Sequence, residues 1–147
     1  IKIARDMGAD YGFNINKMDN CGPGEKVMEL TKGTGADIQV EAAGAAPKTI
    51  PEMEKSLSSQ GKIIYLGRAA TKTSMYLDTL VSGANMVVGA RGHAGSGIFP
   101  NIIKLIASGR LELKKMITAK YPFVNILGAI KKSVDRKDGK ILIRMDD

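Results

Sequence analysis

Three observations predict that this sequence folds as an α/β domain with a parallel sheet. Short apolar runs of strand length recur about every 25 residues, and stretches with helical spacing of apolar residues separate them. The runs are apolar throughout instead of alternating, as expected when helices cover both faces of the sheet. Strands and helices that alternate in this way are typical of βαβ units.

The first element is a helix, because Ile1, Ala4 and Met7 have helical spacing and Gly8 follows them. The chain opens inside this helix without an N-cap, so we expect the sequence to be part of a longer polypeptide. Strands are then predicted at four runs: 11–15, 37–43, 62–66 and 86–90.

Helices are predicted between these strands. Val27 and Leu30 mark the first; Ile50, Met53 and Leu57 mark the second. Thr49 and Glu52 have the spacing of a capping box at the start of this second helix, with Pro51 in its first turn.

The pattern changes after the third strand. The segment 74–83 should hold a short extended piece followed by a turn or short helix. The helix after Gly97 has Pro100 near its start and Gly109 past its end. From residue 111 onward the sequence predicts a strand at 116–121, a helix over 123–134 and a strand at 140–145, so we place a boundary between regions 1–110 and 111–147.

Composition limits the function classes. The sequence is 44% hydrophobic and 25% charged, and no apolar run approaches the roughly 20 residues of a membrane helix. Without a visible secretory leader, and with Cys21 as its one cysteine, we expect a cytoplasmic protein. The net charge is +7, and its excess lies after Ile103, with 11 basic and 5 acidic side chains. Because aromatic residues do not interleave with the basic ones, nucleic acid is a disfavoured partner.

Small residues follow three predicted strands, where ligands bind in an open parallel sheet. They are Ala43-Gly44-Ala45, Gly67-Arg68-Ala69 and Gly89-Ala90-Arg91-Gly92. Singly, such turns are only tight turns; three at successive strand ends favour a nucleotide site. The sequence Gly33-Thr34-Gly35 precedes a strand, so it is a loop and not a phosphate-binding turn.

Candidates for direct chemistry are few. Cys21 and His93 are the only cysteine and histidine, and they are isolated from each other, so no zinc site is expected. His93 is read as a loop residue, with contact to a ligand as the alternative. Glu41 lies in an apolar strand, where a carboxylate needs hydrogen-bonded partners, so a structural role is favoured over a catalytic one.

Several segments in order resemble the medium-chain, zinc-type alcohol, sorbitol and threonine dehydrogenases. These are 4–10, Val40-Glu41-Ala42-Ala43-Gly44, 62–67 and 88–92. The stretch 89–109 resembles polyol or inosose dehydrogenases most. The resemblance implies a partial Rossmann-like sheet, with the phosphate-binding turn and the zinc-bearing catalytic domain upstream of Ile1.

The resemblance further implies that the chain binds NAD or NADP. Ala43 and Gly44 would lie near the adenosine, and Lys140 would reach the pyrophosphate. The nicotinamide side would be lined by six residues: Leu66, Gly67, Arg68, Ala90, Arg91 and Gly92.

The implied parent enzyme passes a hydride from a small alcohol, polyol or cyclitol to the nicotinamide, with zinc polarising the oxygen. Its zinc ligands are not in this chain, so the 147-residue chain alone is expected to be inactive. The segment 74–90 would pair subunits into a homodimer or tetramer. The alternatives are a non-catalytic nucleotide-binding module and a basic nucleic-acid-binding domain.

Overall fold

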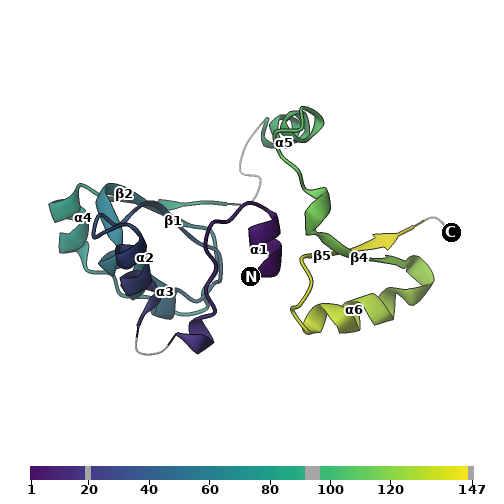
Figure 1. Ribbon diagram of the computed structural model, residues 1–147, viewed down its shortest axis with the longest axis horizontal. Helices are drawn as coiled ribbons and strands as arrows, with labels where there is room; N and C mark the ends of the chain where they lie inside the picture. Colours follow the sequence, from purple (N-terminus) through teal and green to yellow (C-terminus); the bar gives the residue numbers. More distant parts are fainter. Residues whose placement is uncertain (19–20, 92–96, 146–147) are drawn as a thin grey trace. The chain divides into compact units, whose positions relative to one another are not determined.

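The computed structural model describes residues 1–18, 21–91 and 97–145, which form two compact units (Figure 1). The central unit comprises residues 15–95, and the terminal unit comprises residues 1–14 and 96–147. Within the described ranges, no helix combines the length and the apolar character needed to cross a membrane.

The central unit is built on a three-stranded parallel sheet, which confirms the predicted α/β fold. Its strands are β1 (Ala36–Glu41), β2 (Leu57–Tyr65) and β3 (Met86–Gly89), in the order β1-β2-β3. Tyr65 pairs with Glu41 on one side and with Gly89 on the other. The three strands therefore finish level with one another, and the turns that follow them leave from one edge of the sheet.

Three helices pack within the central unit: α2 (Pro23–Leu30), α3 (Ala46–Lys55) and α4 (Leu77–Gly83). Helix α3 packs against β1 and β2, while α2 lies beside α3 and α4 contacts β2 (Figure 1). The buried core joins Ala46 and Ile50 of α3 to Ile63 of β2, which has no exposed surface. This core holds α3 against β2.

The predicted capping box at Thr49 and Glu52 is wrong. Helix α3 begins at Ala46 and has Pro47, not Pro51, in its first turn, so Thr49, Pro51 and Glu52 all lie inside the helix. The Thr49 hydroxyl donates to Glu41, and Glu52 accepts a hydrogen bond from Gly24. The spacing of a capping box is a property of the local sequence. In the structure, the side chains of Thr49 and Glu52 form hydrogen bonds with other elements instead.

Leu57 was predicted to continue the second helix, but it begins β2 instead. Helix α3 ends at Lys55, and Leu57 pairs with Ala36 of β1. The next pair in the ladder is Ile38 with Lys62, so β2 bulges between these positions, and Gln60 has a φ of 60°. Pairing with the neighbouring strand has outweighed the helical spacing of the apolar residues.

The predicted strand over 11–15 is not formed. Residues 11–14 have no regular structure, and Ile15–Lys17 form a 3₁₀ turn, η1. The Tyr11 and Phe13 rings stack with centroids 6.4 Å apart, as side chains two residues apart do on an extended backbone. Among the described residues no strand pairs with this segment, so its backbone lacks the ladder that defines a strand.

The terminal unit contains the predicted strand–helix–strand segment. Strands β4 (Ile117–Pro122) and β5 (Lys140–Arg144) are parallel, and α6 (Ile126–Val134) connects them. The 3₁₀ turns η2 (Lys114–Met116) and η3 (Phe123–Asn125) flank β4. The unit also includes α1 (Lys2–Asp6) and α5 (Ile98–Ala107). Gly109, with a φ of 71°, follows the end of α5 as predicted.

Candidate functional site

The carboxyl edge of the central sheet gathers most of the predicted ligand-binding residues. Because Glu41, Tyr65 and Gly89 are in register, the segments that follow them leave the sheet side by side. These segments hold seven of the predicted residues: Ala43, Gly44, Leu66, Gly67, Arg68, Ala90 and Arg91. Gly92 and His93 lie outside the described residues.

Two of these turns touch through their backbones. Gly44 has a φ of 67°, which favours glycine, and a Cβ on it would lie 2.8 Å from the Arg68 carbonyl oxygen. A Cβ on Gly67 would overlap the Gly44 nitrogen and the Glu41 carboxylate. The turns after β1 and β2 therefore depend on glycine at both positions.

Glu41 lies beneath this contact and is 2% exposed. Its carboxylate accepts hydrogen bonds from the Gly44 and Ala45 main-chain nitrogens, at 3.3 and 3.1 Å, and from the Thr49 hydroxyl at 3.3 Å. A carboxylate in an apolar strand was predicted to need hydrogen-bonded partners, and these three contacts supply them.

A cavity of about 500 Å³ opens beside β1 in the same unit. Its wall is mainly apolar and includes Pro23 and Val27 of α2, Met53 of α3, and Val40 and Ala43 in and after β1. Ala42 and Ala43 are exposed, and their side chains are small, so they leave main-chain groups at this edge accessible.

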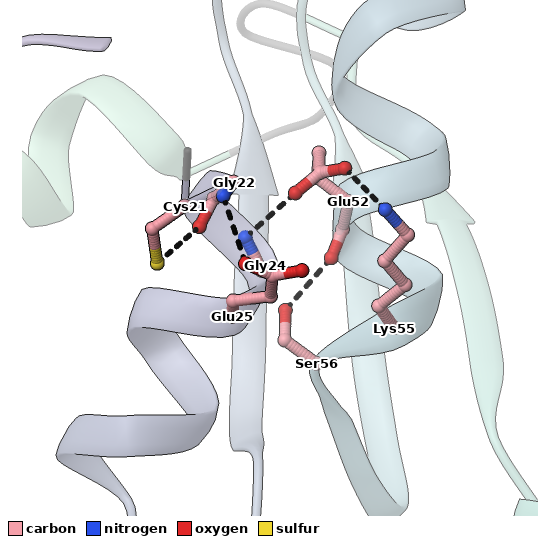
Figure 2. Close-up of polar contacts among 7 residues, drawn as sticks. All are labelled: Cys21, Gly22, Gly24, Glu25, Glu52, Lys55 and Ser56. Atoms are coloured by element: carbon pink, nitrogen blue, oxygen red, sulfur yellow. Dashed lines mark hydrogen bonds and ion pairs between the residues drawn. The ribbon is translucent and has the colours of Figure 1, made fainter. Parts of the chain in front are cut away.

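A polar cluster joins the start of α2 to the end of α3 (Figure 2). The Gly24 nitrogen donates to Glu52 Oε2 at 2.9 Å, and Lys55 Nζ lies 2.7 Å from Glu52 Oε1. The Ser56 hydroxyl donates to the Glu52 carbonyl at 2.9 Å. Lys55 is the main reason that the pKa of Glu52 lies below its usual value, and the Gly24 N–H contributes further.

The role of Glu52 as an acceptor at the start of α2 is not predicted from the sequence. The signal that was present is the start of α2, where Gly22, Pro23 and Gly24 provide no capping side chain. Glu25 accepts from the Gly22 nitrogen at 3.2 Å, whereas the Gly24 N–H, one of the first N–H groups that a helix leaves without an intrahelical partner, finds its acceptor on α3. The sequence does not show which acidic residue supplies it, because Gly24 and Glu52 are 28 positions apart.

Cys21 lies in the same cluster, where its thiol is 3.7 Å from the Gly22 carbonyl oxygen (Figure 2). Desolvation raises the pKa of the Cys21 thiol, and Glu25 raises it further. A thiol held in its neutral form is a weak nucleophile and a weak metal ligand. Over the described ranges, no group of three or more histidine, cysteine or acidic side chains is arranged to hold a metal, so these residues do not fit a zinc site.

Lys140 lies in the terminal unit as the first residue of β5, and its side chain is exposed. Two hydrogen bonds connect the residues just before Lys140 to β4. Thr118 Oγ1 donates to Asp138 Oδ1 at 2.6 Å, and the Gly139 nitrogen donates to Thr118 Oγ1 at 3.2 Å. These bonds and the pairing of β5 with β4 hold the backbone at Lys140 in place within the terminal unit.

Known proteins similar to this chain are dehydrogenases. The family model of zinc-binding dehydrogenases matches residues 1–108. An alcohol dehydrogenase of Cupriavidus necator is 29% identical over 97% of this chain, which spans 38% of that enzyme. The scyllo-inosose 3-dehydrogenase of Thermotoga maritima is 28% identical over 79% of the chain and 29% of its own length. The L-threonine 3-dehydrogenase of Pyrococcus abyssi is 31% identical over 82% of the chain and 34% of its own length.

A solved structure supports the fold. Benzyl alcohol dehydrogenase from Acinetobacter calcoaceticus superimposes with a TM-score of 0.84 at 22% identity, over 99% of this chain and 40% of its own. The chain thus belongs to the zinc-binding dehydrogenase family, which confirms the resemblance drawn from its motifs. It spans well under half of the relatives it matches.

Proposed function

We propose that this chain is the distal part of the NAD(P)-binding domain of a zinc-type alcohol or polyol dehydrogenase. The observation that carries this proposal is the shared edge of β1, β2 and β3, where glycine-containing turns follow β1 and β2 and all three strands finish in register. In open parallel sheets this edge is where dinucleotides bind. Family membership supports the same reading.

We assign the residues at this edge, and Gly92 beyond the described ones, to the dinucleotide. Ala43 and Gly44 would lie along the adenosine, where their small side chains let a flat ring approach the backbone. Main-chain groups of Leu66, Gly67 and Arg68, with Ala90, Arg91 and Gly92, would hold the carboxamide of the nicotinamide. When bound, the coenzyme supplies the hydride acceptor.

The proposed enzyme needs parts that the described residues do not supply. Because the described residues do not fit a zinc site, we place the zinc ligands outside them. We also propose that residues 1–110 belong to the coenzyme domain and that residues 111–147 return to the catalytic domain. Lys140 would contribute a positive charge to the coenzyme pyrophosphate.

We further propose that the segment 74–90 pairs two subunits. Strand β3 has β2 on one side only among the described strands, and its side chains Met86, Val87 and Val88 are between 42% and 45% exposed. An apolar edge strand of this kind is a template for sheet extension.

The test is steady-state oxidation of alcohols by the complete polypeptide that carries this sequence, followed by the absorbance of the reduced nicotinamide. We expect reduction of NAD⁺ or NADP⁺ with secondary alcohols, polyols or cyclitols, and loss of activity after zinc removal. A folded, zinc-loaded polypeptide that neither binds nor reduces either coenzyme would overturn the proposal.

A further inference from the structure

The turns after β1 and β2 share a single buried residue. Glu41 holds the first turn with its carboxylate, which accepts hydrogen bonds from the Gly44 and Ala45 nitrogens. It holds the second turn with its main-chain carbonyl, which accepts from the Leu66 nitrogen at 2.9 Å and the Gly67 nitrogen at 2.7 Å. Four main-chain N–H groups from two turns therefore converge on one residue.

The contact geometry makes the two turns depend on each other through this carboxylate. Oε2 of Glu41 accepts from Gly44 and would also lie only 2.3 Å from a Cβ added at residue 67. Oε1 accepts from Ala45 and from Thr49, which is on α3. The carboxylate thus lies between β1, the first turn of α3 and the second glycine turn.

The donors to the Glu41 carboxylate are two main-chain N–H groups and one hydroxyl, none of which carries a charge. None of the ion pairs formed by the described residues includes Glu41, although the side chain is 2% exposed. Its removal would leave two main-chain nitrogens at Gly44 and Ala45 without acceptors, so the turn would have to move to find water.

We infer that Glu41 is a positioning residue for the coenzyme: it holds the turns at Gly44 and Gly67 in the arrangement that the dinucleotide binds. This rests on the proposed function, because the coenzyme is what the two turns would contact. Glu41 itself lies under the turns and acts through them.

The experiment compares the complete polypeptide with its Glu41→Ala and Glu41→Gln variants. The dissociation constant of NADH or NADPH is measured by fluorescence titration, at a temperature where circular dichroism shows all forms folded. Ile63→Val is the matched control, because Ile63 is buried in the core of the same sheet but contacts neither turn through a hydrogen bond. Hydrogen exchange of the amides at 44, 45 and 67 is measured without coenzyme.

We expect Glu41→Ala to weaken coenzyme binding about tenfold or more and to speed exchange at these amides. Glu41→Gln retains one carbonyl oxygen and should fall between the wild type and Glu41→Ala. Ile63→Val should lower the melting temperature and leave the dissociation constant unchanged. Coenzyme affinity that stays at the wild-type value in folded Glu41→Ala would overturn the inference and leave the proposed function standing.

Hydrogen exchange distinguishes a failure of the proposed function from a failure of the inference about Glu41. If the wild type binds neither coenzyme, the proposed function fails, and with it the coenzyme role of Glu41. In that case, faster exchange at 44, 45 and 67 in Glu41→Ala would show only that Glu41 holds the turns.

Discussion

At the residue scale, Gly67 is a position where an added side chain would collide with the backbone of another turn. A Cβ there would meet the Gly44 nitrogen and the carboxylate of Glu41. Backbone atoms cannot move aside as the end of a flexible side chain can, so the two turns would have to separate.

We therefore predict that Gly67→Ala lowers the free energy of unfolding by about 1–3 kcal/mol and weakens coenzyme binding. Denaturant unfolding and NADH titration check the two effects. Gly128→Ala is the control: Gly128 lies in α6, and an added Cβ there would have no atom within 4 Å. That change should be neutral or stabilising, by up to about 1 kcal/mol. If both variants behave alike, the close approach of the turns is not what constrains Gly67.

Glu52 gives a prediction in pH. Its pKa lies below the usual value of 4.5, chiefly because of Lys55. A lowered pKa adds stability that is fully present above the unfolded-state pKa and is lost as the pH falls through the folded-state pKa. The pKa of Lys55 is raised by Glu52. The stability that Lys55 contributes is therefore fully present below its usual pKa of 10.5 and is lost as the pH rises through its folded-state pKa.

Glu52→Gln should accordingly destabilise the protein by about 1 kcal/mol at neutral pH, as expected for a charge removed from a helix N-terminus. The difference from the wild type should shrink as the pH falls below the usual carboxyl pKa of 4.5. Urea unfolding at pH 7 and in acid measures it. Glu29→Gln is the control, because Glu29 is near the other end of α2 and pairs with Lys26 at the surface. A difference that does not depend on pH would contradict the assigned ion pair.

Lys140 tests the proposed role of the terminal unit. Lys140→Ala should weaken coenzyme binding by about 1 kcal/mol or more, the typical value of a charge-assisted contact. The coenzyme Michaelis constant of the complete polypeptide measures this. Lys120→Ala provides the comparison, since Lys120 is an exposed lysine on the neighbouring strand β4. An unchanged Michaelis constant in Lys140→Ala would remove Lys140 from the coenzyme site.

At the scale of elements, we make a prediction about β3, the exposed edge strand of the described central sheet. Val87→Asp places a charge in the middle of β3, whose apolar side chains are exposed. We predict that it raises the dimer dissociation constant at least tenfold in sedimentation experiments. Val134→Asp on α6 alters an equally apolar exposed position outside the segment 74–90 and should leave assembly unchanged. Equal assembly by both variants would argue against pairing through β3.

The positions of the strands could be predicted from the sequence better than the ends of the elements. The strands β1, β2 and β3 could be predicted because apolar runs of strand length recur between stretches with helical spacing. The ends of elements were less accurate, because Leu57 and Thr49 are placed by contacts with β1 that local spacing does not contain. The run 11–15 has strand-like residues, but no described strand pairs with it, and pairing is not a local property.

At the scale of the whole molecule, the residues of the candidate site could be predicted because glycine and small residues recur after successive strands. Their grouping at one edge follows from parallel order, which the βαβ pattern implies. The partners of Glu41 and Glu52 could not be predicted in the same way. Each buried or capped group needs donors or acceptors, but their identity depends on three-dimensional packing.

The central claim is that the dinucleotide binds where β1, β2 and β3 finish in register. A crystal structure of the complete polypeptide with NADH or NADPH bound tests it most directly. We predict that the coenzyme lies across this edge, with its adenosine beside Gly44 and its carboxamide at the backbone of Gly67 and Ala90. A dinucleotide bound elsewhere, with this edge covered by other parts of the protein, would contradict the account.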